Sequence, residues 1–373
     1  MSYDIAIIGA GIAGASVAWS LAQRAPGLKV VLVEGESQPG YHTTGRSAAF
    51  WVESYGGPGI VPLTRAGRGF FDAPPEGFNT PLLTPRPGLF IAPPDDADFA
   101  DANGRGALAT MAAEFDEGGV PYTVMDAGML AGTPAAVMLK PEWRQRGLWQ
   151  DGGSDIDVAA LHQGFLRGRE IVRDARVTGI ARDSAGWRLE TTAGPIAAKT
   201  IVNAAGAWGD EIAALAGVRP LGLRPLRRSM AVLITDPPPP ADLPVVLDAA
   251  GRFYFKPDGG RLWLSPHDET PDMPHDVRPD EMDLAVVIDR FEQASPVTVK
   301  RLDSSWAGLR TFAPDRLPVF GFDAAVPDFF WCVGQGGVGI QTAPAAGELC
   351  AALLLGEAPA VDARPYAPAR FEM

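Results

Sequence analysis

Residues 3–14 read YDIAIIGAGIAG, a short apolar run that leads directly into the pattern Gly-x-Gly-x-x-Gly. The run predicts a buried β-strand, and the helix formers of residues 15–24 predict a helix directly after the glycines. A second apolar run, residues 29–33, ends on Glu34. A strand, glycine turn, helix, second strand and terminal acid in this order predict a dinucleotide-binding site. A glycine-rich turn in an ordinary α/β protein is the alternative.

Each glycine of this unit has its own physical reason. Gly9 permits the tight turn from strand to helix, Gly11 leaves room for a diphosphate against the backbone, and Gly14 lets the helix lie close to the strand. The free amide groups at the start of the helix favour a negative charge. Glu34 can accept hydrogen bonds from ribose hydroxyls, and its charge would repel a 2′-phosphate.

The chain of 373 residues is long enough for two domains with cores of their own. Its 46% hydrophobic and 21% charged residues are typical of a globular protein. No apolar stretch has the length of a membrane span and no signal peptide precedes the first strand, so we expect a cytoplasmic protein, with peripheral contact to the inner membrane left open. The net charge of −13 argues against nucleic acid as a partner, because a phosphate backbone would be repelled.

Polar residues suited to a phosphate follow the second strand. Residues 35–50 read GESQPGYHTTGRSAAF and leave the carboxyl edge of that strand, where ligands bind in such folds. Thr43, Thr44, Arg46 and Ser47 supply hydroxyls and a guanidinium for phosphate oxygens. A polar loop with a helix N-cap is the alternative interpretation.

Two later stretches combine a strand with small residues. Residues 200–208, TIVNAAGAW, predict a strand that ends where another backbone or a ligand comes close. Residues 329–342 predict a strand, a glycine loop and the start of a helix. Such a loop lets a large flat ligand lie against the backbone, and the helix dipole favours negative charge there.

Histidines and acids gather in one loop, which contains His267, Asp268, Glu269, Asp272, His275 and Asp276. No spacing among them holds two on one face of a helix or strand, so we expect a solvated loop and no metal site. His162 lies on a predicted helix and is expected to be structural.

Together these segments resemble the FAD-dependent D-amino-acid oxidase superfamily. The resemblance rests on GAGIAG with Glu34, YHTTGRSAAF, VNAAGAW, WAGLRTFAPDRLPVFG and GQGGVGIQT, in this order over the whole chain. Within the superfamily, PLLTPRPG, LHQGFLRG, AGVRPLGLRP and FYFKPD resemble segments of the bacterial D-arginine dehydrogenase type.

The resemblance implies an α/β (α+β) fold with two domains interleaved in sequence. A Rossmann-type FAD-binding domain would comprise residues 1–80, 150–218 and 322–373. An antiparallel-sheet substrate-binding domain would comprise residues 81–149 and 219–321. FAD would be bound without a covalent link. Its expected contacts are Gly9, Gly11, Ile12, Ala13, Gly14, Glu34, His42, Thr43, Thr44, Arg46, Ser47, Ala48, Val177, Ala205, Gly206, Trp208, Gly336, Gly337, Val338, Gly339, Ile340 and Gln341.

On the substrate side, Arg227 and Arg310 resemble the carboxylate binders of the family. Tyr55 and Tyr254 resemble the hydroxyls that join them, and Gly337 resembles a backbone carbonyl that contacts the substrate amine. The chemistry agrees, because guanidinium groups bind carboxylates bidentately. A surface pair on a strand is the alternative for Arg227 and its neighbour.

The departures from the D-arginine type concern the substrate side chain. Phe50 and Val52 stand where the arginine-specific enzyme has a histidine and a threonine, and Gly88 stands where it has a glutamate. Without that glutamate a buried cationic tail would be unpaired. Phe50, Val52 and Gly88, with Gln341 beside the flavin, are therefore predicted to form an apolar pocket for a neutral side chain. Glu53 could restore a negative group.

The expected reaction is FAD-dependent oxidative deamination of a D-amino acid. Hydride would pass to flavin N5, and the imino acid would be hydrolysed to a 2-oxo acid and ammonia. None of the four histidines is placed by a motif to act as a base. The electron acceptor would be a quinone, a dye-like molecule or O2. The alternatives are oxidation of a secondary amino acid such as sarcosine or proline, oxidation of a 2-hydroxy acid, and a flavin-free NAD-binding or structural module.

Overall fold

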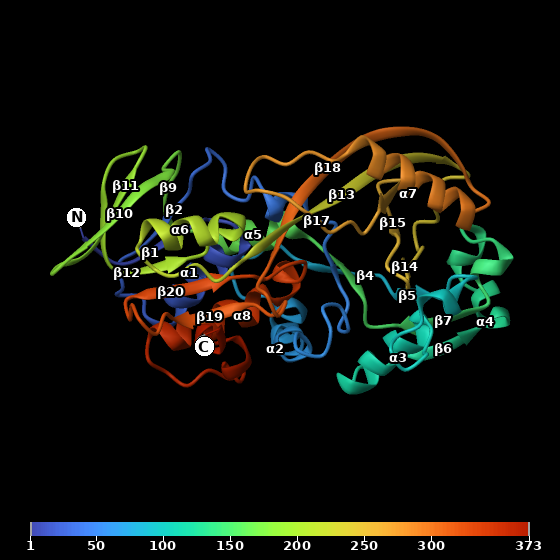
Figure 1. Ribbon diagram of the computed structural model, residues 1–373, viewed down its shortest axis with the longest axis horizontal. Coiled ribbons are helices and arrows are strands. Elements are labelled where there is room, and N and C mark those ends of the chain that lie inside the picture. The colour runs from blue at the N-terminus through green and yellow to red at the C-terminus, as the bar shows by residue number, and fades with distance from the viewer. Residues whose placement is uncertain (1, 372–373) are drawn as a thin grey trace.

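The computed structural model describes residues 2–371 and places most of its strands in two large sheets. Figure 1 shows these sheets side by side along the long axis, with both chain ends in the half that holds the first sheet. A small third sheet joins β3 (Phe50–Trp51), β8 (Ser154–Ile156) and β4 (Leu83–Pro85). The mixed α/β fold predicted from the sequence is confirmed.

The first sheet has eight strands around a parallel centre. β1 (Ser2–Ile8) lies between β2 (Val30–Val33) and β12 (Ile196–Asn203) and is parallel to both. β9 (Glu170–Val172) continues the sheet beyond β2, and β20 (Phe329–Val333) continues it beyond β12, again in parallel. The antiparallel additions are β10 (Val177–Asp183), β11 (Gly186–Thr191) and β19 (Val319–Phe322).

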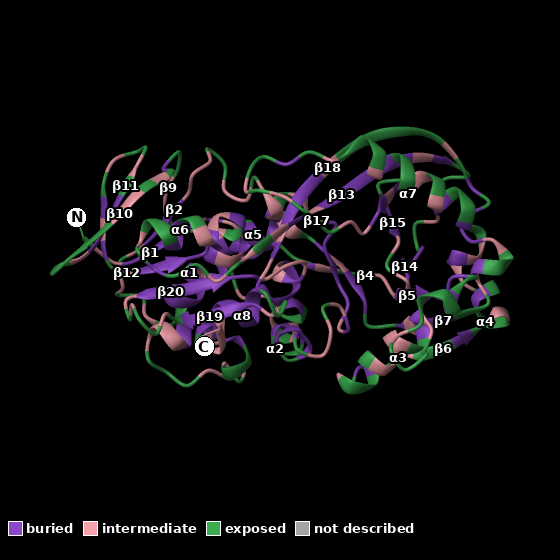
Figure 2. Cartoon of the chain, in the orientation of Figure 1, coloured by how far each residue is buried: buried purple, intermediate pink, exposed green. Residues whose placement is uncertain are grey.

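Helices cover both faces of this sheet. Ile5 and Ile7 of β1 are buried with residues of α1 (Ile12–Arg24) and α8 (Gly339–Leu354). Ala6 and Ile8 are buried on the opposite face with residues of α6 (Gly209–Leu215). A central parallel strand needs apolar residues on both faces, which is why β1 shows no polar alternation. The buried centre of the sheet is visible in Figure 2. The outer helices are α5 (Val158–Leu166) against α1 and α2 (Val61–Asp72) against α8.

The second sheet has nine strands and is mostly antiparallel. Its path runs through β17 (Thr270–Pro271), β13 (Arg224–Asp236), β16 (Arg261–Ser265), β15 (Tyr254–Asp258), β14 (Val245–Asp248), β5 (Gly88–Ile91), β7 (Arg146–Gln150) and β6 (Thr123–Asp126). β18 (Thr298–Phe312) pairs with β13 outside this path. α7 (Glu281–Ala294) buries Leu284 and Phe291 against the sheet. α3 (Ala107–Glu117) and α4 (Ala127–Ala131) lie near β6 and β7 (Figure 1).

The long antiparallel ribbon of β13 and β18 connects the two halves of the molecule (Figure 1). It pairs from Arg224 opposite Phe312 to Asp236 opposite Thr298. At the first of these ends Phe312 forms a bridge with Gln335, which directly precedes the glycines before α8. The ribbon therefore sets the position of residues of the second sheet relative to the glycine loops of the first.

The strands support a division of the chain into two domains. Strands of the second sheet lie within residues 88–150 and 224–312, and strands of the first lie within residues 2–33, 170–203 and 319–333. We therefore propose the predicted domain segments, with the last boundary before Val319 because β19 pairs with β20.

Substitution of Gly14 by Ala is expected to destabilise the fold. A Cβ atom at this position would overlap the Gly9 carbonyl oxygen and would lie 3.0 Å from Ile7 Cγ2. Such overpacking costs about 1–3 kcal/mol, so we expect a loss of this size in the free energy of unfolding measured in urea. Gly27→Ala is the matched control, since nothing lies within 4 Å of its added Cβ. Equal stability of the two variants would contradict the close approach of α1 to β1.

Candidate active site

A continuous groove runs along the glycine turn between β1 and α1. Two adjoining cavities share Gly11, Thr43, Thr44, Ala204 and Gly206 as lining residues. One cavity extends outward to Glu34, and the other extends inward to the residues of β13 and β18. Segments that are far apart in the sequence thus contribute to one elongated site.

The glycine turn has the geometry that a bound diphosphate requires. Gly9 has a φ of +103°, and a Cβ there would lie 2.5 Å from the Ala204 carbonyl oxygen. The Ile12 amide donates to Thr44 Oγ1 at 3.0 Å, which connects the start of α1 to the polar segment. The next helical amides have no intrahelical carbonyl partner, because the first turn of a helix leaves its N–H groups free. Gly11 and Ala13 line the groove at this point.

Glu34 lies at the carboxyl end of β2 and lines the outer cavity. Its carboxylate accepts from the amides of Ala10 at 2.9 Å and Glu36 at 3.0 Å. His42, Val177 and Trp208 line the same cavity. The rings of His42 and Trp208 have centroids 4.7 Å apart. This end combines a carboxylate with aromatic surface, which suits a nucleoside.

His162 of α5 contacts the backbone of the glycine turn. Its Nε2 lies 2.8 Å from the Ala10 carbonyl oxygen, and burial lowers the pKa of its imidazole. It does not line either of the two cavities of the groove. This position agrees with the structural role expected from the sequence.

The short helical turn Thr43–Arg46 joins the groove to β18. Thr43 Oγ1 donates to the Leu309 carbonyl oxygen at 2.7 Å. Arg46 lines the groove, but its guanidinium donates to the carbonyl oxygens of Val277 and Ala307 at 3.0 and 3.2 Å and pairs with Asp276. Arg46 therefore connects the two sheets, and a direct contact with phosphate remains a prediction.

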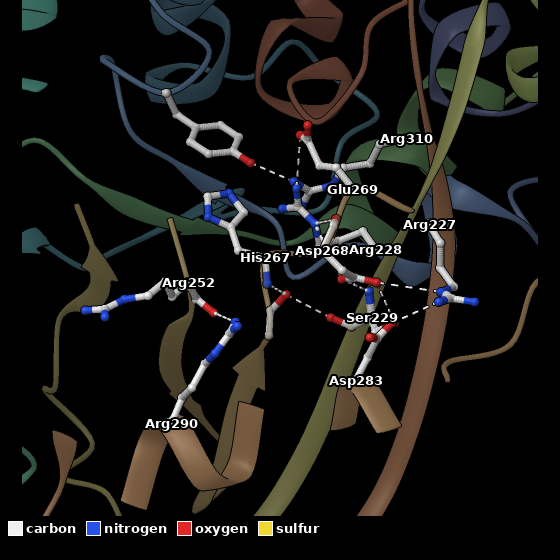
Figure 3. A network of polar contacts seen from close by, with 12 residues as sticks. Arg227, Arg228, Ser229, Arg252, His267, Asp268, Glu269, Asp283, Arg290 and Arg310 are labelled. Atoms are coloured by element: carbon white, nitrogen blue, oxygen red, sulfur yellow. Dashed lines mark hydrogen bonds and ion pairs between the residues drawn. The ribbon is translucent and has the colours of Figure 1, made fainter. Parts of the chain in front are cut away.

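The inner end of the groove is rich in positive charge. Arg228, Tyr254 and Arg310 line it together with the backbone of Gly336 and Gly337. The Arg310 guanidinium donates to the Tyr55 hydroxyl at 2.7 Å, and Figure 3 shows Arg228 and Arg310 close together. A smaller adjoining cavity is lined by Phe50, Tyr55 and Gln341.

Polar atoms at this end are buried without partners. Within residues 2–371, Arg228 Nη1, the Tyr254 hydroxyl and Thr311 Oγ1 make no hydrogen bond. Buried donors are normally paired, so orphaned donors around one cavity indicate a ligand that accepts hydrogen bonds. Two guanidinium groups beside them favour an anion.

The prediction that Arg227 faces this cavity is wrong. Arg227 donates to Asp283 of α7 at 2.8 Å and lies on the other face of β13, whereas Arg228 lines the cavity (Figure 3). Side chains alternate along a strand, so a shift of one residue moves a side chain to the opposite face. The strand register explains why Arg228 faces the cavity. Leu226 is opposite Arg310, and Arg228 lies two residues further along β13 on the same face.

The charges of the site affect one another. Burial lowers the pKa of Arg228, and the like charge of Arg310 lowers it further. Burial alone would raise the pKa of the Tyr55 phenol, but Arg310 and Arg228 outweigh burial and the pKa is lowered. Burial opposes the charge of Arg310, yet its interactions with Tyr55 and Tyr254 leave its pKa raised. The cluster is thus held together partly by phenol oxygens that face two cations.

Two of the predicted pocket residues do not reach the cavity. Val52 is buried and Gly88 packs against it, with Val52 Cγ2 3.5 Å from where a Cβ of Gly88 would lie. Val52 belongs to the same apolar cluster as Phe50, which itself lines the cavity. Of the remaining predicted residues, Gln341 uses its amide to bind the Tyr55 carbonyl oxygen and Thr64 Oγ1.

The predicted FAD contacts divide into those that line the cavities and those that support them. Ile12, Ser47, Ala48, Ala205, Gly339 and Ile340 line the cavities. Gly14 and Val338 do not, because Gly14 packs under the Gly9 carbonyl group and Val338 packs near Gly56. All of these contacts with FAD stay predictions.

The loop expected to be solvated is only partly so: Glu269, His275 and Asp276 are exposed, whereas Asp268 contacts residues of the site. Asp268 accepts from the amide and hydroxyl of Ser229 at 2.7 and 2.9 Å, and its carbonyl oxygen accepts from Arg228 Nε at 2.7 Å. Glu269 pairs with Arg228 at 3.3 Å and with Arg316 at 2.8 Å. His267 lies against Tyr254, with ring centroids 5.6 Å apart. The sequence signal was the clustering of polar residues directly after a predicted strand.

Two expected absences concern the chain as far as it is described. Among residues 2–371 no group of three His, Cys, Asp or Glu side chains is arranged to hold a metal ion. No helix in this range is both long and apolar enough to cross a membrane.

Known proteins resemble this chain over nearly its full length. Hydrogen cyanide synthase subunit HcnC of Pseudomonas aeruginosa is 25% identical over 417 residues, which cover 100% of this chain and 97% of that protein. Glycine oxidase of Geobacillus kaustophilus is 26% identical over 391 residues, covering 99% and 97%. The solved L-proline dehydrogenase from P. horikoshii has a TM-score of 0.82 at 22% identity, covering 100% and 98%, and shows the same fold.

A family model agrees with the groove, the fold and these relatives. The model of the FAD dependent oxidoreductases, DAO, matches residues 4–353. This range contains the glycine turn before α1, the glycine loop before α8, and the cavity residues Arg228 and Arg310. The chain therefore belongs to the DAO family of FAD-dependent oxidoreductases.

Proposed function

We propose that this protein oxidises the Cα–N bond of a D-amino acid with a neutral, apolar or aromatic side chain. The imino acid so formed is hydrolysed to a 2-oxo acid and ammonia. The observation that carries the proposal is the set of orphaned donors, Arg228 Nη1 and the Tyr254 hydroxyl, beside Arg310 in one cavity with the Gly336–Gly337 backbone. The D configuration is supported by the resemblance to the D-arginine dehydrogenase type.

FAD is the cofactor of the family, and the groove fits it. The free amides of α1 and Thr44 suit the diphosphate, Glu34 suits the ribose, and the glycines at 336 and 337 admit a flat ring. When bound, FAD takes up the two electrons and the hydrogen that the substrate loses. The contribution of the chain is to bind and orient the substrate.

A carboxylate is the anion that best matches the inner end. Arg228 and Arg310 project from neighbouring strands to the same side, so each can donate to one carboxylate oxygen. The Tyr254 hydroxyl can complete the set. With the carboxylate held there, the amine lies toward Gly337, where the predicted carbonyl contact would orient it.

The lining favours a neutral side chain. The residues of the inner cavities include no aspartate or glutamate, while Phe50, Tyr55 and Met230 supply aromatic and aliphatic surface. Glu53, which was considered as a negative group for this pocket, pairs with Arg65 instead. Because the nearby carboxylates already have cationic partners, a cationic substrate tail would be buried unpaired, which costs several kcal/mol.

A secondary amino acid is the second candidate. The same carboxylate site would serve sarcosine or proline, and the apolar wall of Phe50 and Met230 can accept an N-alkyl group. Glycine oxidase, a relative with 26% identity, shows by its name that the family includes enzymes for amino acids without a large side chain.

A substrate panel tests the choice between these reactions. We expect kcat/KM for D-leucine, D-methionine or D-phenylalanine to exceed that for D-arginine by at least about 100-fold, the size of a few kcal/mol in transition-state binding. L-amino acids, sarcosine, proline and 2-hydroxy acids complete the panel. Dye reduction measured beside peroxide release identifies the acceptor as dye-like or O2. A preference for D-arginine would contradict a neutral pocket, and turnover of proline or sarcosine alone would favour the second candidate.

Adjacent arginines give a matched pair of variants for the carboxylate site. Arg228→Gln removes a charged donor from the cavity, and hydrogen bonds to charged groups contribute about 1.5–3 kcal/mol, so kcat/KM should fall about 10- to 150-fold. Arg227→Gln changes the opposite face, where Arg227 pairs with Asp283 at 2.8 Å and lies 3.8 Å from Asp268, and should change kcat/KM by less than about threefold because the cavity keeps both of its arginines. Flavin absorbance shows that both variants are folded. A larger loss of kcat/KM in Arg227→Gln than in Arg228→Gln would mean that the side chain of Arg227, and not that of Arg228, faces the cavity.

A further inference from the structure

Lys256 of β15 is a buried lysine that the proposed reaction does not use. Its side chain is 3% exposed, and its Nζ donates to the Ala48 carbonyl oxygen at 3.1 Å and to Asp155 Oδ1 at 2.5 Å. Lysine is almost never buried to this extent unless it is paired. One ion pair and one backbone carbonyl group thus hold its ammonium group in place.

Asp155 connects this ammonium group to the small third sheet. Asp155 lies on β8, directly opposite Phe50 of β3. Its second carboxylate oxygen pairs with Arg86, whose guanidinium also donates to the Leu243 carbonyl oxygen. The carboxylate is therefore fixed by two cations, and it links Lys256 of the second sheet to the strand that carries Phe50.

The backbone that Lys256 contacts is strained. Ala49 has a φ of +25°, which a residue with a side chain rarely adopts unless its surroundings hold it there. Its amide donates to Ser47 Oγ at 3.1 Å, and its carbonyl oxygen accepts from the Ile156 amide at 3.1 Å. The ammonium group of Lys256 holds the carbonyl group of the preceding residue. Three hydrogen bonds thus fix the short turn that leads into β3.

This turn, Ala48–Phe50, is a wall of the candidate active site. Its first residue lines the inner end of the groove, and all three line the smaller cavity together with Arg310 and Gly337. The ring of Phe50 lies beside that of Tyr55, with centroids 5.2 Å apart. Lys256 lines neither of these two cavities, so it can affect a ligand only through the wall.

We propose that Lys256 is a positioning residue that holds the Ala48–Phe50 wall against the side chain of the substrate. The inference rests on the proposed function, in which Arg228 and Arg310 bind the substrate carboxylate. Those arginines project from β13 and β18, whereas the wall is held from β15 and β8. The two sets of contacts share no residue. Loss of the ammonium group would therefore release the wall and leave the carboxylate site intact.

Two carboxylates of different size test this role without turnover. Acetate occupies only the carboxylate site, whereas 3-phenylpropanoate extends a ring toward the wall. Their dissociation constants are measured from the flavin absorbance of the holoenzyme. Lys256→Met keeps the length of the side chain but removes the donor, and should weaken binding of 3-phenylpropanoate at least about 10-fold, the lower end of what a hydrogen bond to a charged group contributes. Acetate should bind within about twofold of the wild type.

Three further variants complete the test. Lys300→Met is the matched control, because Lys300 pairs with Asp236 at 2.8 Å at an exposed place, and it should bind both carboxylates as the wild type does. Ala49→Gly added to Lys256→Met should restore part of the lost affinity, since glycine adopts a positive φ without strain. Lys256→Gln keeps a polar group at the buried position and should show the same selective loss, which covers the case in which Lys256→Met does not fold.

The ratio of the two dissociation constants separates positioning from a merely structural role. An ion pair that only stabilises the fold would lower the free energy of unfolding in Lys256→Met and leave this ratio unchanged. That result, an equal loss for both carboxylates, or no recovery with Ala49→Gly would overturn the role of Lys256. A wild-type holoenzyme that binds neither carboxylate and oxidises no amino acid would overturn the proposed function itself.

Discussion

The pairing of β13 with β18 is the constraint on which the site depends. Leu226 lies opposite Arg310, so Arg228, two residues further, projects to the same side of the ribbon as Arg310. Diagonal neighbours of this kind are about 7–8 Å apart at the backbone, within reach of two long side chains that converge on one ligand. The same ribbon extends toward the glycine turns through the Phe312–Gln335 bridge. Strand register thus decides that two cations face the groove of the cofactor.

Local features were predictable from the sequence, and features of register were not. The turn around Gly9 and Gly14 follows from residues within one short stretch, and its backbone conformation could be expected from that stretch alone. Arg227 and Arg228 are adjacent, and only the pairing with β18 shows which of them faces the cavity. A shift of one residue exchanges the two faces, so composition and motif carry no signal for this choice.

The pocket residues illustrate a second limit. Val52 and Gly88 differ from the arginine-specific pattern, but they contact each other and affect the cavity only through packing. The sequence predicts a solvated turn at His267 and Asp268, because no spacing among the polar residues of this loop places two of them on one face of a helix or strand. Its partners Arg228 and Ser229 come from β13, which is distant in sequence. Whether a polar loop after a strand is solvated or packed against a site depends on the strand that lies beside it, which the local sequence does not show.

Electrostatics connects these observations. Two buried guanidinium groups on one side of a ribbon repel each other, and burial of each charge is costly unless it is paired. The protein offsets part of this cost with Asp268 and Glu269, which pair with Arg228, and with the phenol oxygen of Tyr55, which accepts from Arg310. It leaves Arg228 Nη1 without a partner on the inside. The substrate carboxylate that we propose for this site would supply the missing negative charge, and its binding would relieve this imbalance.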